Sequence, residues 1–277
     1  MSRVEMSDAD WRIQHLPALS EVAADALKLM AAGDVPLGKL ENLVNRDQAL
    51  VLRILRIANS PFYGLSRRVA TIHDAIVLLG LETVRGVIAA AAVMHIFPDQ
   101  PESGMNRSRF WTHSVQVAAA GKLIAEECGF DAGIAFCAGL LHDVGRLVME
   151  FCFPENYARV AAACDAGEMQ ITTAELSHFA FDHGQMGGRV ASGWHLPDSI
   201  HLAIAAHHCP AADHPNPIVD VIHAGDILSH GLGTFPEDLT LVPGLDAEVW
   251  RRLDLGESLL AQLLPRIDKL SRGMQLL

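Results

Sequence analysis

Apolar residues along this chain recur with the spacing of amphipathic helices. In the first third the pattern predicts short helices over residues 21–32, 37–44, 48–58, 72–79 and 82–97. Ser20 and Thr71 stand where two of these helices need an N-cap, and Gly33 follows the end of the first. No alternation longer than a few residues indicates a strand, so the predicted fold class is all-α.

A second group of helices is predicted beyond residue 104. Apolar, helix-like segments cover roughly residues 110–128, 131–141, 155–166, 172–180, 184–194, 199–208 and 218–229, and two more lie at 246–253 and 258–270. Residues 98–104 are polar and carry two prolines, which is typical of a linker. We therefore predict a helical N-terminal subdomain (15–97) packed against a second helical domain (104–232), with a helical C-terminal appendage (233–277).

Composition and charge narrow the function classes. The 21 basic and 33 acidic residues give a net charge of −12, which argues against nucleic acid as a partner. The N-terminus has no apolar signal core, and the apolar run at 86–97 is too short to span a bilayer. The five cysteines show no C-x-x-C spacing, as expected of free thiols in a reducing compartment. We expect a soluble, cytoplasmic protein with no membrane partner.

The stretch Gly139 to Arg146 is the chemical centre of the sequence. An apolar run at 134–141 predicts a buried helix, and His142 and Asp143 follow it directly. On a continuous helix these two side chains would project about 100° apart. A buried His–Asp pair needs hydrogen-bond partners or a metal ion.

Other potential ligands stand on separate helix-like segments. They are His113, His183, the pair His207-His208, and Asp226. Imidazoles and carboxylates without a thiolate suit Fe, Mn, Zn or Ni, and we predict that this set converges with the central pair to bind one or two such ions. Shared protons and hydrogen bonds are the alternative. His223, three residues before Asp226, would be a local hydrogen-bond partner of Asp226 under this alternative, and would orient a ligand if a metal ion is bound.

The order of these residues resembles that of the HD superfamily of metal-dependent phosphohydrolases: His, then His-Asp, then a distant Asp. The extra His183 and His207-His208 are similar to the two-metal branch that degrades cyclic dinucleotides. The Gly-Tyr-Pro signature of that branch is missing, because residues 207–213 read His-His-Cys-Pro-Ala-Ala-Asp.

The wider sequence resembles the HDOD (HD-related output domain) family from about residue 15 to 232. The matching segments are 16–19, 56–64, 75–80, 111–114, 139–145 and 194–197. The resemblance implies an HD-like domain at 104–232 and a signalling output module in bacterial regulation. Such a module would act through protein interaction with signalling partners that the sequence does not identify, or as a homo-oligomer.

The alternative function is a metal-dependent phosphohydrolase acting on a nucleotide or another phosphoester. It would need a positively charged phosphate clamp, for which Arg146, Lys122 and Arg189 are the candidates. Because no phosphate-binding or nucleoside-reading motif is visible, the sequence by itself favours the interaction module, with a metal site that is vestigial.

Two further motifs are predicted to be structural. His73-Asp74 repeats the central dipeptide, but it lies in the first turn of a capped helix, where an aspartate complements the helix N-terminus. Asn59, Ser60, Phe62 and Tyr63 surround Pro61, which disfavours helix in the residue before it, so they predict a turn. Histidines such as His15, His95, His178, His195 and His201 are assigned no role.

Overall fold

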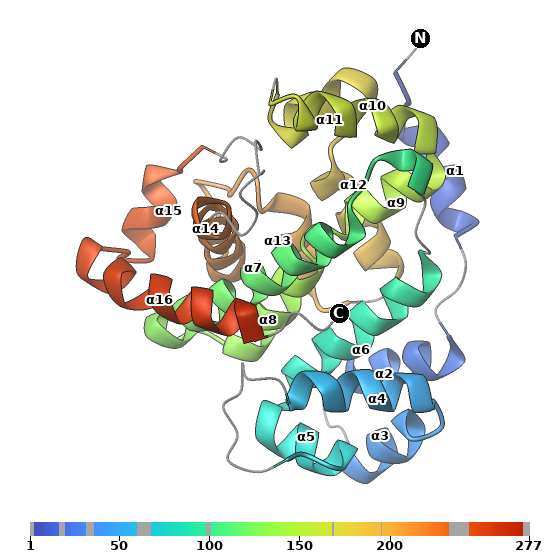
Figure 1. Cartoon of the computed structure of the whole chain (residues 1–277), viewed down its shortest axis with the longest axis vertical. Coiled ribbons are helices and arrows are strands. Elements are labelled where there is room, and N and C mark those ends of the chain that lie inside the picture. Colours follow the sequence, from blue (N-terminus) through green and yellow to red (C-terminus); the bar gives the residue numbers. More distant parts are fainter. Residues whose placement is uncertain are drawn as a thin grey trace.

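The structure is a computed structural model. It describes residues 3–16, 20–31, 36–59, 68–97, 101–167, 169–194, 196–232 and 244–273. Within these ranges the chain is helical, and the one β contact is an isolated bridge between Val4 and Phe179 (Figure 1). The predicted all-α fold class is confirmed.

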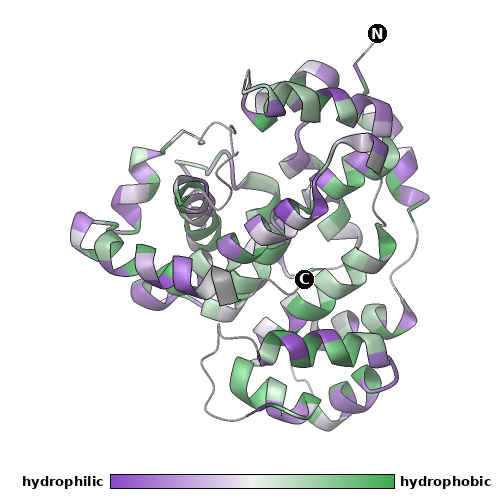
Figure 2. Cartoon of the chain, in the orientation of Figure 1, coloured by the Kyte–Doolittle hydropathy of each residue, from purple (hydrophilic) through white to green (hydrophobic). Residues whose placement is uncertain are grey.

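The N-terminal helices gather around one long helix. They are α2 (Glu21–Ala31), α3 (Leu37–Val44), α4 (Gln48–Ala58), α5 (Ile72–Leu79) and the central α6 (Leu81–Ile96). Helices α2, α4 and α5 all pack on α6, which is apolar along most of its length (Figure 2). The N-terminal ends of α4 and α5 lie where they were predicted and are capped by side chains. Asp47 accepts a hydrogen bond from the Leu50 amide, and Thr71 accepts one from the Asp74 amide.

The remaining helices form the HD-like part and the C-terminal appendage. They are η2 (Pro101–Ser103), α7 (Arg107–Cys128), α8 (Ala132–Leu141), α9 (Val144–Cys152), α10 (Pro154–Asp165), α11 (Ile171–His178), α12 (His183–Gly193), α13 (Asp198–Ala206), α14 (Pro217–Gly231), α15 (Ala247–Arg252) and α16 (Glu257–Gly273). The helix α1 (Met6–Gln14) precedes the N-terminal group in sequence but packs on α9 of the HD-like part.

Helix α8 is the element that joins the two parts. It contacts α6 on one side and α7, α13 and α14 on the others. The helices approach closely at glycines: a Cβ at Gly86 would lie 2.8 Å from the Cα of Cys137, and one at Gly139 would lie 2.7 Å from the Cα of Ala118. The stretch Ala132–Cys152 is apolar and long enough to cross a membrane by length and composition alone, but 78% of its 18-residue apolar window is buried inside the protein. Its apolar character is therefore that of core helices.

The C-terminal appendage is attached to the helices that carry the candidate site. Helix α16 packs on α7, and α15 packs on α14. The guanidinium of Arg252 makes two hydrogen bonds to the carboxylate of Asp220, at 2.6 and 2.7 Å, and Asp220 is buried. The appendage thus packs on the HD-like part, while the exact domain boundaries stay a prediction.

The two motifs predicted to be structural lie away from the central histidines. His73 is in the first turn of α5, with its side chain 56% exposed and 3.6 Å from Glu41. The Asn59 side chain donates to the carbonyls of Leu55 and Val69 and accepts from the Val69 amide, so it closes the loop that follows α4. Ser60, Phe62 and Tyr63 lie outside the described residues. All five cysteines are free, as predicted.

Candidate metal centre

The central dipeptide lies at a break between two helices, and not on the continuous helix considered above. Helix α8 ends at Leu141, His142 follows as its C-cap, and Asp143 precedes the first residue of α9. Gly145, in the first turn of α9, lets this helix lie against α12, because a Cβ at this position would lie 1.9 Å from the carbonyl oxygen of His183. Only a glycine lets α9 pass so close to α12, and this contact brings Asp143 beside His183.

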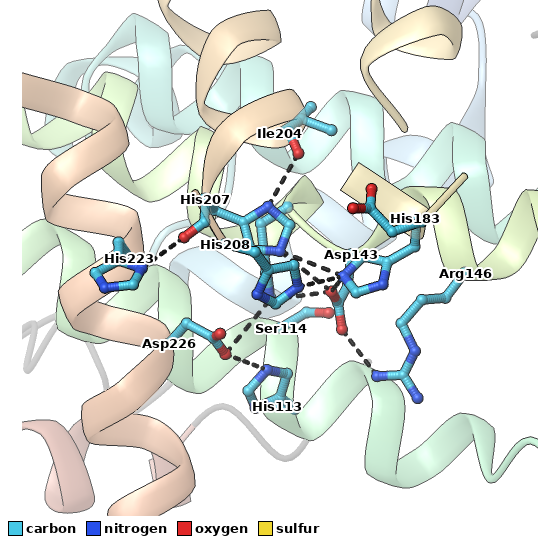
Figure 3. A network of polar contacts seen from close by, with 12 residues as sticks. His113, Ser114, Asp143, Arg146, His183, Ile204, His207, His208, His223 and Asp226 are labelled. Carbon is cyan, nitrogen blue, oxygen red and sulfur yellow. Dashed lines mark hydrogen bonds and ion pairs between the residues drawn. The ribbon is translucent and has the colours of Figure 1, made fainter. Parts of the chain in front are cut away.

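Asp143 is the hub of the first group of donors (Figure 3). Its Oδ1 lies 3.0 Å from Nε2 of His183, 3.4 Å from Nε2 of His142 and 3.8 Å from Nε2 of His207. Its Oδ2 accepts a hydrogen bond of 2.9 Å from Arg146. Asp143 is 3% exposed, so these contacts lie in a region from which water is largely excluded.

The imidazoles are oriented by acceptors behind them. Nδ1 of His142 is 2.8 Å from the carbonyl of Gly139, and Nδ1 of His207 is 2.9 Å from that of Ile204. Nδ1 of His183 is 2.7 Å from Oε2 of Glu175. Because carbonyl and carboxylate oxygens can only accept, each Nδ1 carries the hydrogen, and each Nε2 directs either a lone pair or a second proton toward the centre.

The facing Nε2 atoms need a hydrogen or a metal ion between them. His183 Nε2 lies 2.8 Å from His208 Nε2 and 3.3 Å from His207 Nε2. Two lone pairs at this separation repel, so either a proton or a metal ion must lie between the rings. Donors held this way by carbonyls and carboxylates are typical of metal-ligating histidines.

Without metal, His183 is the ring that holds the proton. Burial by itself lowers its pKa, but the carboxylates of Glu175 and Asp143 outweigh burial and raise the pKa of His183 to about 10. Burial and the neighbouring histidines lower the pKa of His207 to about 3. Burial raises the pKa of Asp143, but His142, His183 and Arg146 hold it well below its ordinary value.

Asp226, from the middle of α14, is the hub of a second group of donors. Its Oδ1 lies 3.0 Å from Nε2 of His113, 3.4 Å from Nε2 of His230 and 3.9 Å from Nε2 of His142. Burial lowers the pKa of His113 to about 4, despite the adjacent Asp226. His230 was left without a role by the sequence, although its spacing of four residues from Asp226 on one helix was a usable signal.

His223 points away from Asp226, its predicted local partner. Its Nδ1 donates a hydrogen bond of 2.7 Å to the carbonyl of His207. It therefore fixes the backbone of a candidate ligand, which is the second of the two roles that its sequence position suggested. The Nε2 of His223 is buried without a hydrogen-bond partner, and His223 is one of the residues that line the cavity described below.

The residues fit a divalent metal. Three sets of donors each lie within 4.8 Å of one another: Asp143, His183, His207 and His208; His113, Asp226 and His230; and His113, His142 and Asp143. Nε2 of His142 and Oδ1 of Asp226 are buried without a hydrogen-bond partner. Such a buried atom costs about 1–3 kcal/mol unless a ligand satisfies it. The cluster can therefore bind a metal ion, and the seven predicted ligands lie around one centre.

A cavity of about 520 Å³ adjoins the cluster. Its walls include six donors of the cluster: His113, Asp143, His183, His208, Asp226 and His230. Helices α7, α9, α10, α11 and α14 and the loops beside them supply the rest of the lining, including the polar side chains of Arg109, Gln116, Arg146 and Gln170. A small molecule in this cavity would therefore contact both the donors and two guanidinium groups.

The three predicted clamp residues lie in different places. Arg146 is at the cavity wall, held by Asp143 and by the hydroxyl of Tyr157 at 3.1 Å. Arg189 instead forms an ion pair of 2.8 Å with Asp10 of α1, and neither it nor Lys122 is among the described residues that line the cavity. Arg109, one turn before His113 on α7, also lines the cavity. The sequence did not identify it as a clamp residue, because its proximity to the cavity depends on how α7 packs.

Comparisons with known proteins agree with this architecture. The structure resembles that of an HDOD domain protein from Geobacter sulfurreducens (26% identity, TM-score 0.78, 98% of each chain covered). It also resembles a Marinobacter aquaeolei protein named provisionally as a signal transduction protein (25% identity, TM-score 0.74), covering 94% of this chain and 60% of that one.

Curated relatives are longer proteins. An uncharacterised protein of Treponema pallidum (strain Nichols) is 25% identical over 211 residues, which are 75% of this chain but 40% of that protein. Ribonuclease Y of Clostridium perfringens is 29% identical over 96 residues, or 14% of its length. This chain thus spans less than half of these relatives. The sequence matches the HDOD domain family over residues 16–210, most of its length, and the chain therefore belongs to that family.

Proposed function

We propose that the HD-like part of this chain binds one or two divalent transition-metal ions, Fe, Mn, Zn or Ni, and hydrolyses a phosphoester. The observation that carries the proposal is the position of the donor cluster in the wall of a cavity that also exposes Arg146. A vestigial site kept for stability would need the cluster but would not need this adjoining space.

Each residue has a defined part in this proposal. His113, His142, Asp143, His183, His207, His208 and Asp226 would hold the metal, which supplies an acidified water and neutralises charge on a phosphoryl group. Glu175 holds the ring of His183 in place, and His223 holds the backbone of His207. Arg146 and Arg109 place positive charge at the cavity wall, where an anionic phosphoester would bind.

A signalling module that acts through protein interaction is the second candidate. Family membership and the Marinobacter relative support it, as does the fact that this chain matches only part of longer proteins. On the N-terminal helices, Leu52 of α4 and Val77 of α5 are 66% and 64% exposed and are available for such contacts. The two candidates are compatible in one protein, because these side chains belong to the part that precedes the metal centre.

Metal analysis combined with a hydrolysis assay tests the proposal. The full chain, purified without added metal, should contain transition metal by mass spectrometry and should hydrolyse p-nitrophenyl phosphate or bis-p-nitrophenyl phosphate. His142→Ala and Asp143→Ala should lose both properties, while His73→Ala, which changes an exposed histidine on α5, should keep both. Wild-type protein without metal would contradict the proposed centre. Metal without turnover of either ester would leave the interaction module as the function.

A further inference from the structure

Some apolar side chains of the cavity wall are far more exposed than those of the core. Met169, two residues before α11, is 39% exposed, and Leu176, on α11, is 40% exposed; both line the cavity. Ile171 lies between them in the sequence, is partly exposed and lines the cavity too. We call these three side chains the apolar wall. Apolar surface left open to water in a cavity indicates a ligand that covers it.

The apolar wall belongs to a part of the cavity that supplies no metal donor. Helices α10 and α11 pack on each other and lie together at one edge of the HD-like part (Figure 1). The donors of the cavity wall come from α7, α12 and α14, from the residue between α8 and α9, and from the end of α13. The cavity therefore has two chemically different surfaces, and different helices supply them.

Charge determines which end of a phosphoester lies at which surface. Arg146, beside the donors, pairs with Asp143 and remains partly exposed at the cavity wall. Asp165, the last residue of α10, is exposed and lines the cavity as well. A metal ion and Arg146 would attract an anionic phosphoryl group, and the carboxylate of Asp165 would repel it. The organic group of the ester is therefore directed toward the apolar wall.

The cavity has room for an organic group beside the phosphoryl group. Its volume of about 520 Å³ falls within the range of small-molecule sites, roughly 300–1,000 Å³. The amide side chains of Gln116 and Gln170 also line it, but both already interact with other groups of the chain. The large, partly exposed apolar side chains are thus the surface that a bound organic group would cover.

We infer that the substrate is a phosphoester whose organic group is apolar, and that Met169, Ile171 and Leu176 select this group. The inference rests on the proposed function and adds the substrate class to it. The apolar wall contacts the organic group, while the reacting phosphoryl group lies at the donors and Arg146. A hydrophobic pocket distinguishes ligands that differ by one methylene by about 10-fold or more, so the apolar wall is sufficient to set a preference.

Binding of two phosphonates tests the inference without an activity assay. The full chain is dialysed against Co²⁺, its bound cobalt is measured by mass spectrometry, and the protein is titrated with methylphosphonate or hexylphosphonate in a calorimeter. The two probes carry the same anionic head group and differ in the length of the apolar chain. Hexylphosphonate should bind at least about 10-fold more tightly than methylphosphonate.

Substitutions of two leucines with similar exposure locate the origin of the preference. Leu176→Ala should weaken the binding of hexylphosphonate by about 10-fold and leave that of methylphosphonate unchanged. Leu176→Met keeps an apolar side chain of similar volume and should keep the preference. Leu202 of α13 is 43% exposed and is not among the described residues that line the cavity, so Leu202→Ala should change neither affinity. If Leu176→Ala weakened both probes equally, Leu176 would only support the shape of the cavity and the inference would fail.

The outcomes for the inference and for the proposed function are distinct. Equal affinities of the wild-type protein for the two phosphonates would overturn only the inference, because recognition of the head group would remain. Tighter binding of adenosine monophosphate than of hexylphosphonate would overturn it too, since the cavity would then select a polar organic group. A preference for hexylphosphonate without turnover of either p-nitrophenyl ester would support the apolar wall and overturn the hydrolysis. If neither phosphonate binds, the inference fails together with the phosphate-binding role proposed for Arg146.

Discussion

Replacing Gly145 with alanine is the sharpest test of how the fold builds the centre. A Cβ at this position would lie 1.9 Å from the carbonyl oxygen of His183 and 2.7 Å from the amide nitrogen of Gly187. Both atoms belong to the backbone of α12, so no side-chain rotation can relieve the contact. Helices α9 and α12 would have to separate by about 1 Å before the closest contact reached the shortest distance that packed proteins tolerate.

The expected effect concerns both stability and metal binding. Overpacking of this kind destabilises a fold by about 1–3 kcal/mol, and here the displaced atoms are backbone, so we expect the upper end of that range. The same separation pulls His183 away from Asp143, whose contact at 3.0 Å joins the two helices. Gly145→Ala should therefore lower the free energy of unfolding in urea and should also lose bound cobalt.

Gly193 provides the matched control. It is the last residue of α12, and a Cβ there would meet nothing within 4 Å. Alanine is the better helix former, so Gly193→Ala should leave the free energy of unfolding unchanged or raise it by up to about 1 kcal/mol. If Gly145→Ala matched this control in stability and in cobalt content, the close contact of α9 and α12 would not be what builds the site.

Three further predictions concern protons, the appendage and the loop after α4. The pKa of His183 is about 10 in the metal-free chain, above its ordinary value of 6.5. Protonation of His183 therefore stabilises the folded, metal-free chain in full below pH 6.5, and this stabilisation is lost as the pH rises through 10. Cobalt binding at pH 7.5 should release about one proton per chain, seen by calorimetry in buffers of different ionisation enthalpy, and should tighten as pH rises. Arg252→Ala leaves the buried carboxylate of Asp220 unpaired and should cost about 2 kcal/mol in urea unfolding, whereas Arg251→Ala should be neutral. Asn59→Ala removes the hydrogen bonds that close the loop and should cost about 1 kcal/mol while cobalt content stays unchanged; a loss of cobalt instead would mean that this loop supports the centre.

Much of the fold follows from local properties of the sequence. The period of apolar residues predicts the helices, and residues such as Asp47, Thr71 and Asp131 mark their starts because their side chains accept hydrogen bonds from amides three residues on. The types of ligand could also be predicted from the sequence, because a buried histidine and aspartate after an apolar run need polar partners wherever they lie in the fold. These inferences require only neighbours in the chain.

What only the tertiary structure decides is which distant residues meet. The contact that brings Asp143 beside His183 is the close approach of α9 to α12 at Gly145, between residues 38 positions apart. The parts taken by His230 and Arg109, and the absence of Arg189 from the described cavity wall, depend on how α7, α12 and α14 are rotated about their axes. A helical period determines which face of a helix is apolar, but it leaves open which partner covers that face. That choice is made by close packing of the whole core, and it determines where the donors converge.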